Sequence, residues 1–331
     1  MVKIKRNIAV VGCGYWGKNL VRNYAEIGAL GAVCDPNNDV ANFFANEYDV
    51  PHFNFSEVLT NKDIDAVVLA VPAEFHASLA IDVMNAKKHV FVEKPLAMNV
   101  SEANLMIETA KKNNVQLMVG HLLQYHPVFV KLKEIVKSGE LGDLNYIYSN
   151  RLSFGKIRTE EDVIWSFAPH DISMILSLAE EEPQIVKTTS SCIIQPNIAD
   201  TSILHLDFKS QFSAHVFVSW LHPCKEQKLV VIGNKGMAIF DDTQVWEKKL
   251  SIYHHTIKTL KELPTITKGE QNYIRVEKSE PLKNECNHFI EVVCKGQPPL
   301  TDFNEGLKVL KVLSASSLSS IQNKSVKIKD L

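Results

Sequence analysis

The chain has 331 residues, of which 45% are hydrophobic and 22% are charged, and its formal net charge is −2. This composition is typical of a folded globular protein, and a nearly neutral chain lacks the charge excess that would favour a nucleic-acid or membrane-surface partner. The longest apolar runs are the length of a strand, well short of the roughly 20 residues of a membrane span. Because the length exceeds that of one usual core, we expect two domains.

The N-terminus and the cysteines together predict a cytoplasmic protein. The basic residues 1–6 lead into an apolar stretch that breaks at Gly12, which is typical of a first strand and not of a signal peptide. The six cysteines are scattered without a C-x-x-C pair, which fits reduced thiols and gives no zinc motif. The histidines also lack a defensible metal-ligand spacing, so we expect metal-free chemistry.

The first predicted strand, 8–11, ends in a glycine-rich turn with the spacing G-x-G-x-x-G. The first glycine permits a tight turn, the second lets a pyrophosphate approach the backbone, and the third allows a following helix to pack closely. Because a strand precedes the turn and a helix-compatible run follows it, the turn predicts a dinucleotide site. The cofactor-binding residues expected here are Gly12, Gly14, Tyr15, Trp16 and Gly17.

A second apolar strand, 30–35, is closed by Asp35. An acidic residue about 20 residues beyond the glycine turn is the position at which a carboxylate accepts hydrogen bonds from the adenosine ribose. The same carboxylate would repel a 2′-phosphate. Asp35 therefore predicts that the cofactor is NAD in preference to NADP.

Strands and helices alternate regularly through the first third of the chain. The elements predicted after Asp35 are a strand at 64–72, a helix at 74–86, a strand at 89–93, a helix at 101–112 and a strand at 116–120. Such alternation is typical of a doubly wound parallel sheet. We therefore expect residues 1–122 to form an α/β NAD-binding domain of the Rossmann type.

The pattern changes after residue 122. Longer, partly alternating strands are predicted at 145–151, 185–194, 201–208, 212–220 and 228–240, with helices at 127–137, 171–178, 284–295 and 304–321. This pattern is typical of an α+β domain with a large, mostly antiparallel open sheet. We assign residues 123–331 to a substrate and oligomerisation domain, and leave open whether the two C-terminal helices pack back on the first domain.

Two further motifs lie where ligands of open α/β sheets bind. Glu93-Lys94-Pro95 follows a buried strand at its carboxyl end, so Lys94 is either a solvated charge or a group aimed into the cleft. The stretch from Gly120 to Pro127 follows the last strand of the first domain in the same way. Tyr125 in this stretch either lines a substrate pocket or packs between domains.

The segment from Trp165 to Ile172 is expected to open a helix of the second domain. Pro169 suits a first-turn position, and Asp171 suits the positive N-terminal end of a helix. His170 would then project from the start of that helix, where a side chain can face a cleft. Trp165 is either a core residue or a substrate platform.

In order and spacing, these motifs resemble the Gfo/Idh/MocA oxidoreductase family over essentially the full length of the chain. The segments that carry the resemblance are the glycine turn, Val71-Pro72 with His76, Glu93-Lys94-Pro95, Gly120-His121 with Tyr125 and Pro127, Pro169-His170-Asp171, and Pro299 to Leu307. Within the family, the chain is similar to nucleotide-sugar 3-dehydrogenases that act on UDP-N-acetylglucosamine or its uronic acid. This similarity includes the segments 165–171 and 217–223.

The resemblance implies hydride transfer between nicotinamide and a sugar carbon that bears a hydroxyl. It assigns Lys94 to the reacting oxygen and His170 to acid–base catalysis. An imidazole titrates in the range that alcohol oxidation needs, and an ammonium stabilises a developing alkoxide. The remaining site residues expected are Pro72, His76, Glu93 and Lys94 for the cofactor, and Tyr125, Trp165, Ser166 and Asp171 for the substrate.

One position departs from the family pattern. Many relatives carry an aspartate four residues before the histidine, where this chain has Ser166. A hydroxyl cannot supply the negative charge that would raise the pKa of His170. Either His170 works with Lys94 alone, or Asp171 or another carboxylate substitutes, or catalysis has been lost. The alternatives to a nucleotide-sugar dehydrogenase are therefore a non-catalytic NAD-bound sensor and a sugar ketoreductase with another substrate.

The second domain also predicts self-association. Its sheet is rich in apolar residues such as Val216, Phe217 and Val230, and the helices expected there are sufficient to cover only one face. An open apolar face is a large patch for a monomer to expose. We expect a homodimer or homotetramer in which two such faces pack together.

Overall fold

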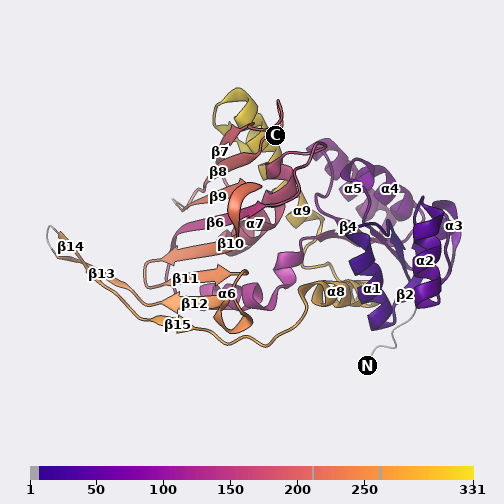
Figure 1. The fold of residues 1–331 in the computed structure, drawn as a ribbon, viewed down its shortest axis with the longest axis horizontal. Helices are drawn as coiled ribbons and strands as arrows, with labels where there is room; N and C mark the ends of the chain where they lie inside the picture. Colours follow the sequence, from indigo (N-terminus) through magenta and orange to yellow (C-terminus); the bar gives the residue numbers. More distant parts are fainter. Residues whose placement is uncertain (1–6, 211, 261–262) are drawn as a thin grey trace. The chain divides into compact units, whose positions relative to one another are not determined.

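The computed structural model describes residues 7–210, 212–260 and 263–331 (Figure 1). The described residues form two compact units. The first unit lies within Met1–Tyr125 and Glu280–Leu310, and the second lies within His126–Ser279 and Lys311–Leu331. The first unit thus combines two segments, because a later segment of the chain returns to it.

The first unit is built on a parallel sheet with the strand order β2-β1-β3-β4-β5. Its strands are β1 (Ile8–Val11), β2 (Leu30–Cys34), β3 (Ala66–Leu69), β4 (His89–Glu93) and β5 (Leu117–Gly120). Its helices are α1 (Gly17–Ile27), α2 (Asn38–Tyr48), α3 (Phe55–Thr60), α4 (His76–Asn85), α5 (Val100–Asn113) and α8 (Pro281–Lys295), with the short helices η1 (Ala73–Phe75) and η2 (Leu122–Tyr125). This arrangement confirms the doubly wound sheet expected from the sequence.

Both faces of this sheet are covered, which explains why its strands are continuously apolar. Ile8, Val10 and Phe91 belong to a core cluster that also includes Phe289 of α8 and residues of α1. Alternate strand residues such as Val67 are also fully buried, and α4 packs against β3 and β4. The carboxyl ends of the strands therefore form a defined edge, where the candidate site lies.

The second unit contains a larger, mostly antiparallel sheet with the order β15-β12-β11-β10-β6-β9-β8-β7-β16. Its strands are β6 (Leu144–Phe154), β7 (Ile185–Ser191), β8 (Thr201–Asp207), β9 (Ser213–Ser219), β10 (Leu221–Gly233), β11 (Met237–Asp241), β12 (Leu250–Tyr253), β15 (Gln271–Tyr273) and β16 (Val326–Lys327). Its helices are α6 (Pro127–Lys137) and α7 (Val163–Ala179), with the short helices η3 (Trp246–Lys248) and η4 (Ile328–Asp330), and α9 (Phe303–Gln322) contributes residues to both units. β6 runs parallel to β9, and the other described strand pairs of this sheet are antiparallel.

The helix that carries His170 does not start where the sequence predicts, in the segment from Trp165 to Ile172. Helix α7 begins at Val163, and Pro169 lies inside it instead of in its first turn. The side chain of Asp162 accepts hydrogen bonds from the backbone N–H groups of Ile164 and Trp165, which is the usual N-cap arrangement. His170 therefore lies in the middle of a helix, and Asp171 is not at its positive end.

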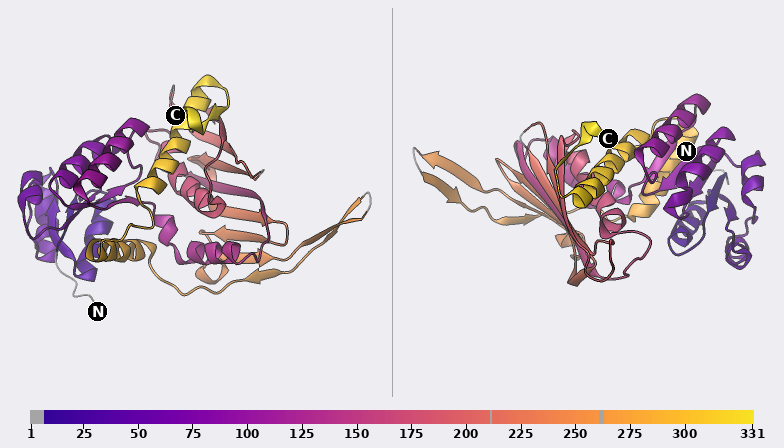
Figure 2. Two further views of the ribbon diagram at one scale, coloured as in Figure 1. Left: turned by 180° about the vertical axis from the view of Figure 1, so that it is seen from behind. Right: turned by 90° about the horizontal axis from the view of Figure 1, so that it is seen from above.

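The predicted strand 228–240 is also wrong, because it is a hairpin. Strand β10 ends at Gly233 and β11 begins at Met237, with Val230 paired to Ile239 across the turn. Beyond the main sheet, β13 (Thr256–Leu260) and β14 (Leu263–Thr267) form a separate two-stranded hairpin. Figure 2 shows this hairpin extending away from the strands of the larger sheet.

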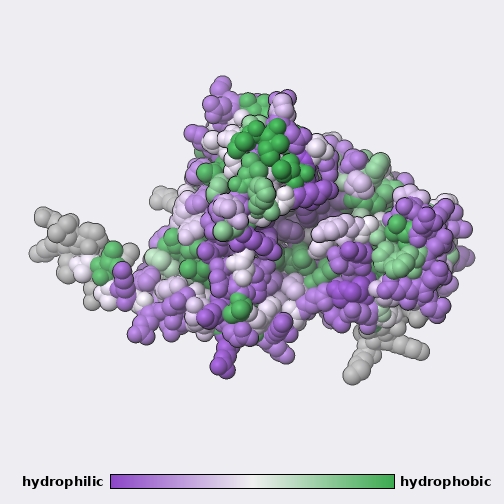
Figure 3. All heavy atoms as spheres, viewed as in Figure 1, coloured by the Kyte–Doolittle hydropathy of each residue, from purple (hydrophilic) through white to green (hydrophobic). Residues whose placement is uncertain are grey.

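The two faces of the larger sheet differ. On one face, Leu204 and Val216 are fully buried, and α7 packs against β6, β8 and β9. On the other face, Ile203 is 38% exposed, and His215 and Phe217 are partly exposed. Figure 3 shows apolar surface, coloured green, over the second unit. The described helices thus leave one face of this sheet incompletely covered.

Candidate functional site

The turn after β1 has the geometry that its glycines predict. Gly12 has a φ of +88°, and a Cβ atom there would lie 2.4 Å from the carbonyl oxygen of Ala70. A Cβ atom at Gly17 would lie 1.8 Å from the carbonyl oxygen of Gly12, so α1 starts too close to the strand for a side chain. Around Gly14, by contrast, open space extends at least 4 Å. The turn is therefore closed at Gly12 and Gly17 and open at Gly14, where a phosphate could approach the backbone.

A cavity of about 870 Å³ adjoins this turn within the first unit. Gly12 and Gly14 line it together with Asp35 and with Val71 and Pro72 of the loop after β3. Apolar and aromatic side chains such as Val71, Phe55 and Phe75 line it beside the polar groups. A cavity of this size with a few converging polar groups is typical of a small-molecule or cofactor site.

Asp35 is fixed in position at the wall of the cavity. One oxygen of its carboxylate accepts a hydrogen bond from the backbone N–H of Cys13 at 2.7 Å, and the other accepts one from the N–H of Asn37 at 2.9 Å. The end of β2 is thereby tied to the glycine turn. Because a carboxylate has further lone pairs, Asp35 can still accept hydrogen bonds from ribose hydroxyls.

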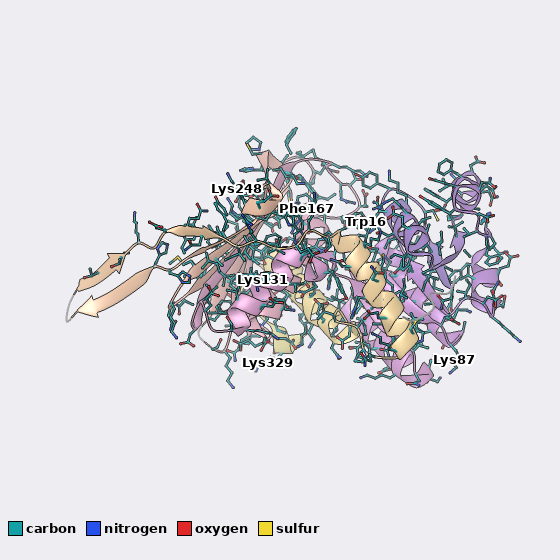
Figure 4. All side chains as sticks on the ribbon, turned by 90° about the horizontal axis from the view of Figure 1, so that it is seen from below. Trp16, Lys87, Lys131, Phe167, Lys248 and Lys329 are labelled. Atoms are coloured by element: carbon teal, nitrogen blue, oxygen red, sulfur yellow. The ribbon has the colours of Figure 1, made fainter. Side chains whose placement is uncertain are left out.

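Trp16 connects the glycine turn to the Glu-Lys-Pro motif. Its indole Nε1 donates to Oε1 of Glu93 at 2.5 Å, and the backbone N–H of Lys94 donates to Oε2 at 3.3 Å. A Cβ atom at Gly120 would lie 3.0 Å from the Glu93 carboxylate, so the neighbouring strand leaves room for it. Burial raises the pKa of Glu93, although the bond from Trp16 opposes this shift. Trp16, which is labelled in Figure 4, is the N-cap residue of α1.

His76 holds two loops of the same edge together. Its Nδ1 lies 2.7 Å from the carbonyl oxygen of Pro95, and its Nε2 lies 3.0 Å from that of Val71. Burial lowers the pKa of His76, and the nearby Lys94 ammonium lowers it further. The imidazole thus positions the loop after β3 beside the segment that carries Lys94, and Lys94 interacts electrostatically with both His76 and Glu93.

Tyr125 and His121 contact other residues of the first unit. The hydroxyl of Tyr125 lies 3.0 Å from the hydroxyl of Thr301, and the side chain is buried in the core cluster. His121 Nδ1 lies 2.5 Å from Oε2 of Glu305. These contacts favour a packing role for Tyr125 over the sugar-pocket role that the sequence left open.

The predicted residues of the second unit all lie on α7, but they have different surroundings. The indole of Trp165 donates to the hydroxyl of Ser317 at 2.8 Å. The carboxylate of Asp171 accepts hydrogen bonds at 2.5 Å from both the Ser149 hydroxyl and Arg151 Nε on β6. Asp171 is 1% exposed, so it anchors α7 to the sheet.

His170 and Ser166 occupy another part of α7. His170 is partly exposed and Ser166 is buried, and they lie one helical turn apart. The structure therefore separates His170 from its sequence neighbour Asp171, whose carboxylate is committed to β6. Among the described residues, groups of three or more His, Cys, Asp or Glu side chains that could hold a metal are absent.

Several cavity residues were not identified from the sequence. Phe55 begins α3, Phe75 lies in η1, and Leu79 lies in α4. One readable signal was Asn54, whose side chain caps α3 in a reciprocal arrangement with Glu57. Recognising that cap would have located the helix whose first residue lines the cavity.

The fold and the glycine turn agree with what is known of related proteins. Residues 6–121 match a family model described as an oxidoreductase family with an NAD-binding Rossmann fold, and residues 129–239 match the GFO/IDH/MocA C-terminal domain. The chain belongs to the Gfo/Idh/MocA oxidoreductase family. It therefore carries the NAD-binding Rossmann domain and the second domain that define this family.

Among proteins of known activity, this Gfo/Idh/MocA chain is similar to two dehydrogenases. It is 26% identical over 302 residues to the myo-inositol 2-dehydrogenase of Thermotoga maritima, covering 86% of this chain and 84% of the relative. It is 25% identical over 308 residues to the UDP-N-acetylglucosamine 3-dehydrogenase of Acidithiobacillus ferrooxidans, covering 93% and 95%. A solved structure of the latter protein superposes with a TM-score of 0.85 at 24% identity, covering 96% of this chain and 98% of that one.

The described helices fall short of the length and apolar character that crossing a membrane would require.

Proposed function

We propose that this protein is an NAD-dependent dehydrogenase that transfers hydride between nicotinamide and a carbon of a sugar, and that its substrate is a nucleotide sugar of the UDP-N-acetylglucosamine type. The observation that carries the proposal is the cavity beside the glycine turn, with Asp35 fixed at its wall by two backbone N–H groups. A cytoplasmic location, with its supply of NAD, is part of the same proposal.

The preference for NAD rests on Asp35. The backbone N–H groups of Cys13 and Asn37 hold both oxygens of its carboxylate in place. A preorganised acceptor can bond to the ribose hydroxyls without a further ordering cost. The same negative charge would repel the 2′-phosphate of NADP. NAD is therefore the cofactor that these residues fit.

The substrate class is supported by the relatives. The names of the two similar dehydrogenases specify a nucleotide sugar and a cyclic polyol, both of which carry secondary hydroxyl groups. We select the nucleotide sugar because the similarity to that relative covers more of both chains. The alternative, a sugar ketoreductase with another substrate, would catalyse the reverse reaction, in which NADH reduces a keto group.

Lys94 and His170 are the residues to which we assign the chemistry. When bound, nicotinamide accepts or returns the hydride of the carbinol carbon. Oxidation also requires the hydroxyl proton to leave as the C–H bond breaks, and His170 takes that proton in our proposal. Lys94, placed at the carboxyl end of β4 by the His76 bridge, stabilises the negative charge that develops on the oxygen.

Asp171 is assigned a different role from the one its sequence position suggested. Its carboxylate is occupied by Ser149 and Arg151, so we propose that it fixes the orientation of α7. His170 then presents its imidazole from a helix that is anchored one residue away. This arrangement supplies a positioned base without a carboxylate at Ser166.

We also propose that the protein forms a homodimer or a homotetramer through the open face of the larger sheet. Ile203, His215 and Phe217 point away from α7 on neighbouring strands, with Ile203 paired to Phe217. A second copy packing its own open face on this one would cover the apolar side chains of both.

A substrate panel tests the proposed function. The purified protein is mixed with NAD+ and, in separate reactions, with UDP-N-acetylglucosamine, its uronic acid, UDP-glucose and myo-inositol, and NADH is followed by its near-ultraviolet absorbance. We expect the fastest NADH formation with an N-acetylated nucleotide sugar. Fastest turnover of myo-inositol would refute the substrate class, and NAD+ binding without any turnover would favour the sensor.

A further inference from the structure

The first unit contains a group of acidic side chains that the proposed reaction does not use. Glu93 ends β4, Glu285 lies in α8, and Glu305 lies in the first turn of α9. We call these three residues the acid cluster. Glu285 is 1% exposed and Glu93 is 9% exposed, whereas the side chain of Glu305 is 20% exposed and is the contact of the cluster with water.

The members of the acid cluster differ in their partners. Glu93 accepts a hydrogen bond from Trp16, and Glu305 is paired with His121. Within the described residues, neither carboxyl oxygen of Glu285 has a hydrogen-bond partner. A buried carboxylate without a partner is strongly unfavourable, so the neutral acid is the form that fits this environment.

The charges around Glu285 act in the same direction. Burial raises its pKa well above the ordinary value, and the negative charges of Glu93 and Glu305 raise it further. Burial and these two negative charges therefore favour the protonated form of Glu285. The titratable groups that face it, or that act on it through Glu93, are Tyr24, Glu93, Lys94, His121, Tyr125, Cys286 and Glu305. Burial also raises the pKa of Tyr24, Tyr125 and Cys286 well above their ordinary values, so these three groups stay neutral.

The acid cluster lies on the side of the sheet that the second nucleotide of a dinucleotide would reach. The strand order places β2, with Asp35, on one side of β1 and places β3, β4 and β5 on the other. Dinucleotides bind across such a point, with the pyrophosphate at the first glycine turn. When the adenosine ribose is at Asp35, the nicotinamide half therefore extends toward the ends of β4 and β5, where Glu93 and Gly120 lie.

We propose that Glu285 couples proton release to the redox state of the cofactor, giving up its proton when NAD+ binds and keeping it when NADH binds. This inference rests on the proposed function, because it requires NAD in the cavity. The oxidised nicotinamide ring carries a positive charge that the reduced ring lacks. In a site shielded from water, that charge stabilises a nearby carboxylate. The proton of Glu285 leaves through Glu305 to water. The negative charge left on the acid cluster then balances the positive charge of the oxidised nicotinamide ring.

Calorimetric titration measures this coupling directly. Wild-type protein is titrated with NAD+, NADH and ADP-ribose between neutral pH and about pH 9, in two buffers with different heats of ionisation, which counts the protons released. One fully linked proton strengthens binding about tenfold per pH unit. We expect the Kd of NAD+ to fall at least about threefold per pH unit, with NADH and ADP-ribose nearly unaffected.

Two variants identify the source of the proton. Glu285→Gln keeps the shape of the side chain and should remove the proton release and the pH dependence of NAD+ binding. Glu291→Gln, an exposed position on the same helix, should behave as wild type. A slope that persists in Glu285→Gln assigns the proton to another group, such as Lys94, and overturns the proposal.

The remaining outcomes also decide the matter. If Glu285→Gln does not fold, the wild-type proton count stands alone, and equal release with NAD+ and NADH refutes the coupling. If wild-type protein binds none of the three ligands, the cofactor site itself is wrong and the proposed function fails with it. Binding of all three ligands without proton release leaves the proposed function intact and removes the inference about Glu285.

Discussion

The edge of the parallel sheet and helix α7 present their predicted functional residues in different ways. At the sheet edge, Gly12, Asp35 and Lys94 each follow a different strand, and contacts such as that of Cys13 with Asp35 join these loops. On α7, His170 and Asp171 are adjacent in sequence but face different surroundings, because successive helical residues are about 100° apart around the axis. A motif at a strand end thus keeps its residues together, whereas a motif inside a helix divides them.

The largest expected effect is a loss of stability on substitution of Asp171, which tests whether this residue is structural and His170 is not. Asp171→Ala leaves the largely buried guanidinium of Arg151 without its carboxylate, and breaking a buried ion pair in this way costs about 3–5 kcal/mol of unfolding free energy. Chemical denaturation measures the loss, with Asp207→Ala, at an exposed position at the end of β8, as the control. Normal stability combined with lost turnover would show that the Asp171 carboxylate takes part in the reaction instead.

Lys94→Ala tests the sheet edge. Turnover should fall roughly 10²-fold or more, the usual scale of support for a developing alkoxide, while the Kd for NAD stays nearly unchanged. Lys87→Ala is the matched control, because Lys87 precedes β4 at the opposite edge of the sheet (Figure 4). Steady-state rates and a binding titration give both quantities. An unaltered rate in Lys94→Ala would remove this residue from the mechanism.

His170→Ala tests the proposed catalytic role of helix α7. If His170 is the base, turnover should also fall roughly 10²-fold, and the limb of the pH–rate profile that reports the base should disappear. His254→Ala, a half-exposed histidine of the same unit, should leave both unchanged. Retention of most activity by His170→Ala would place the proton transfer on another residue.

Asp35→Ala sharpens the account of the cofactor. Removing the carboxylate should weaken NADH binding by about 1.5–3 kcal/mol, the range for hydrogen bonds to a charged group, and should reduce discrimination against NADPH. Asp39→Ala, an exposed acid in the first turn of α2, is the control. Parallel titrations with both cofactors measure the change. Equal affinity of the wild-type protein for NADH and NADPH would contradict the assignment.

The smallest expected effect concerns the open face of the larger sheet. Burial lowers the pKa of His215, and the charge of His205 lowers it further. Between this lowered value and the ordinary 6.5, the unfolded chain binds more protons than the folded chain, so stability falls as the pH falls through that interval and is unaffected above it. Because protonation also places charge on an apolar face, the proposed dimer should weaken by about 1 kcal/mol or less as the pH falls through that interval.

Sedimentation at about pH 8 and about pH 5.5 measures this dependence, and His215→Phe should abolish most of it. A clean monomer under both conditions would refute the assembly through this face.

Much of the first unit could be predicted from the sequence because its signals are local. The apolar strands are buried on both faces, and the glycine spacing reflects steric limits at Gly12 and Gly17 that a side chain would violate. Helices α2 and α3 were missed although Asn37 and Asn54 cap them, because their apolar faces are short. The role of Glu285 could not be predicted, since its surroundings come from segments that are distant in sequence.

The errors in the second unit have local physical causes. The sequence pattern predicts Pro169 in a first turn, but α7 contains it internally and begins after its N-cap, Asp162. The alternation of residues 228–240 continues across the turn between β10 and β11, so the hairpin was interpreted as one strand. The contacts of Asp171 with Ser149 and Arg151 join positions about 20 residues apart, beyond the reach of any local pattern.

The central claim is that hydride passes directly between a sugar carbon and the cofactor. It is tested most directly with the best substrate of the panel, deuterated at the carbon that is oxidised, and with the resulting NADH analysed by mass spectrometry. We predict that NADH acquires the deuterium and that the rate falls when this transfer limits turnover. Unlabelled NADH, or binding of NAD+ with no reduction, would contradict the account.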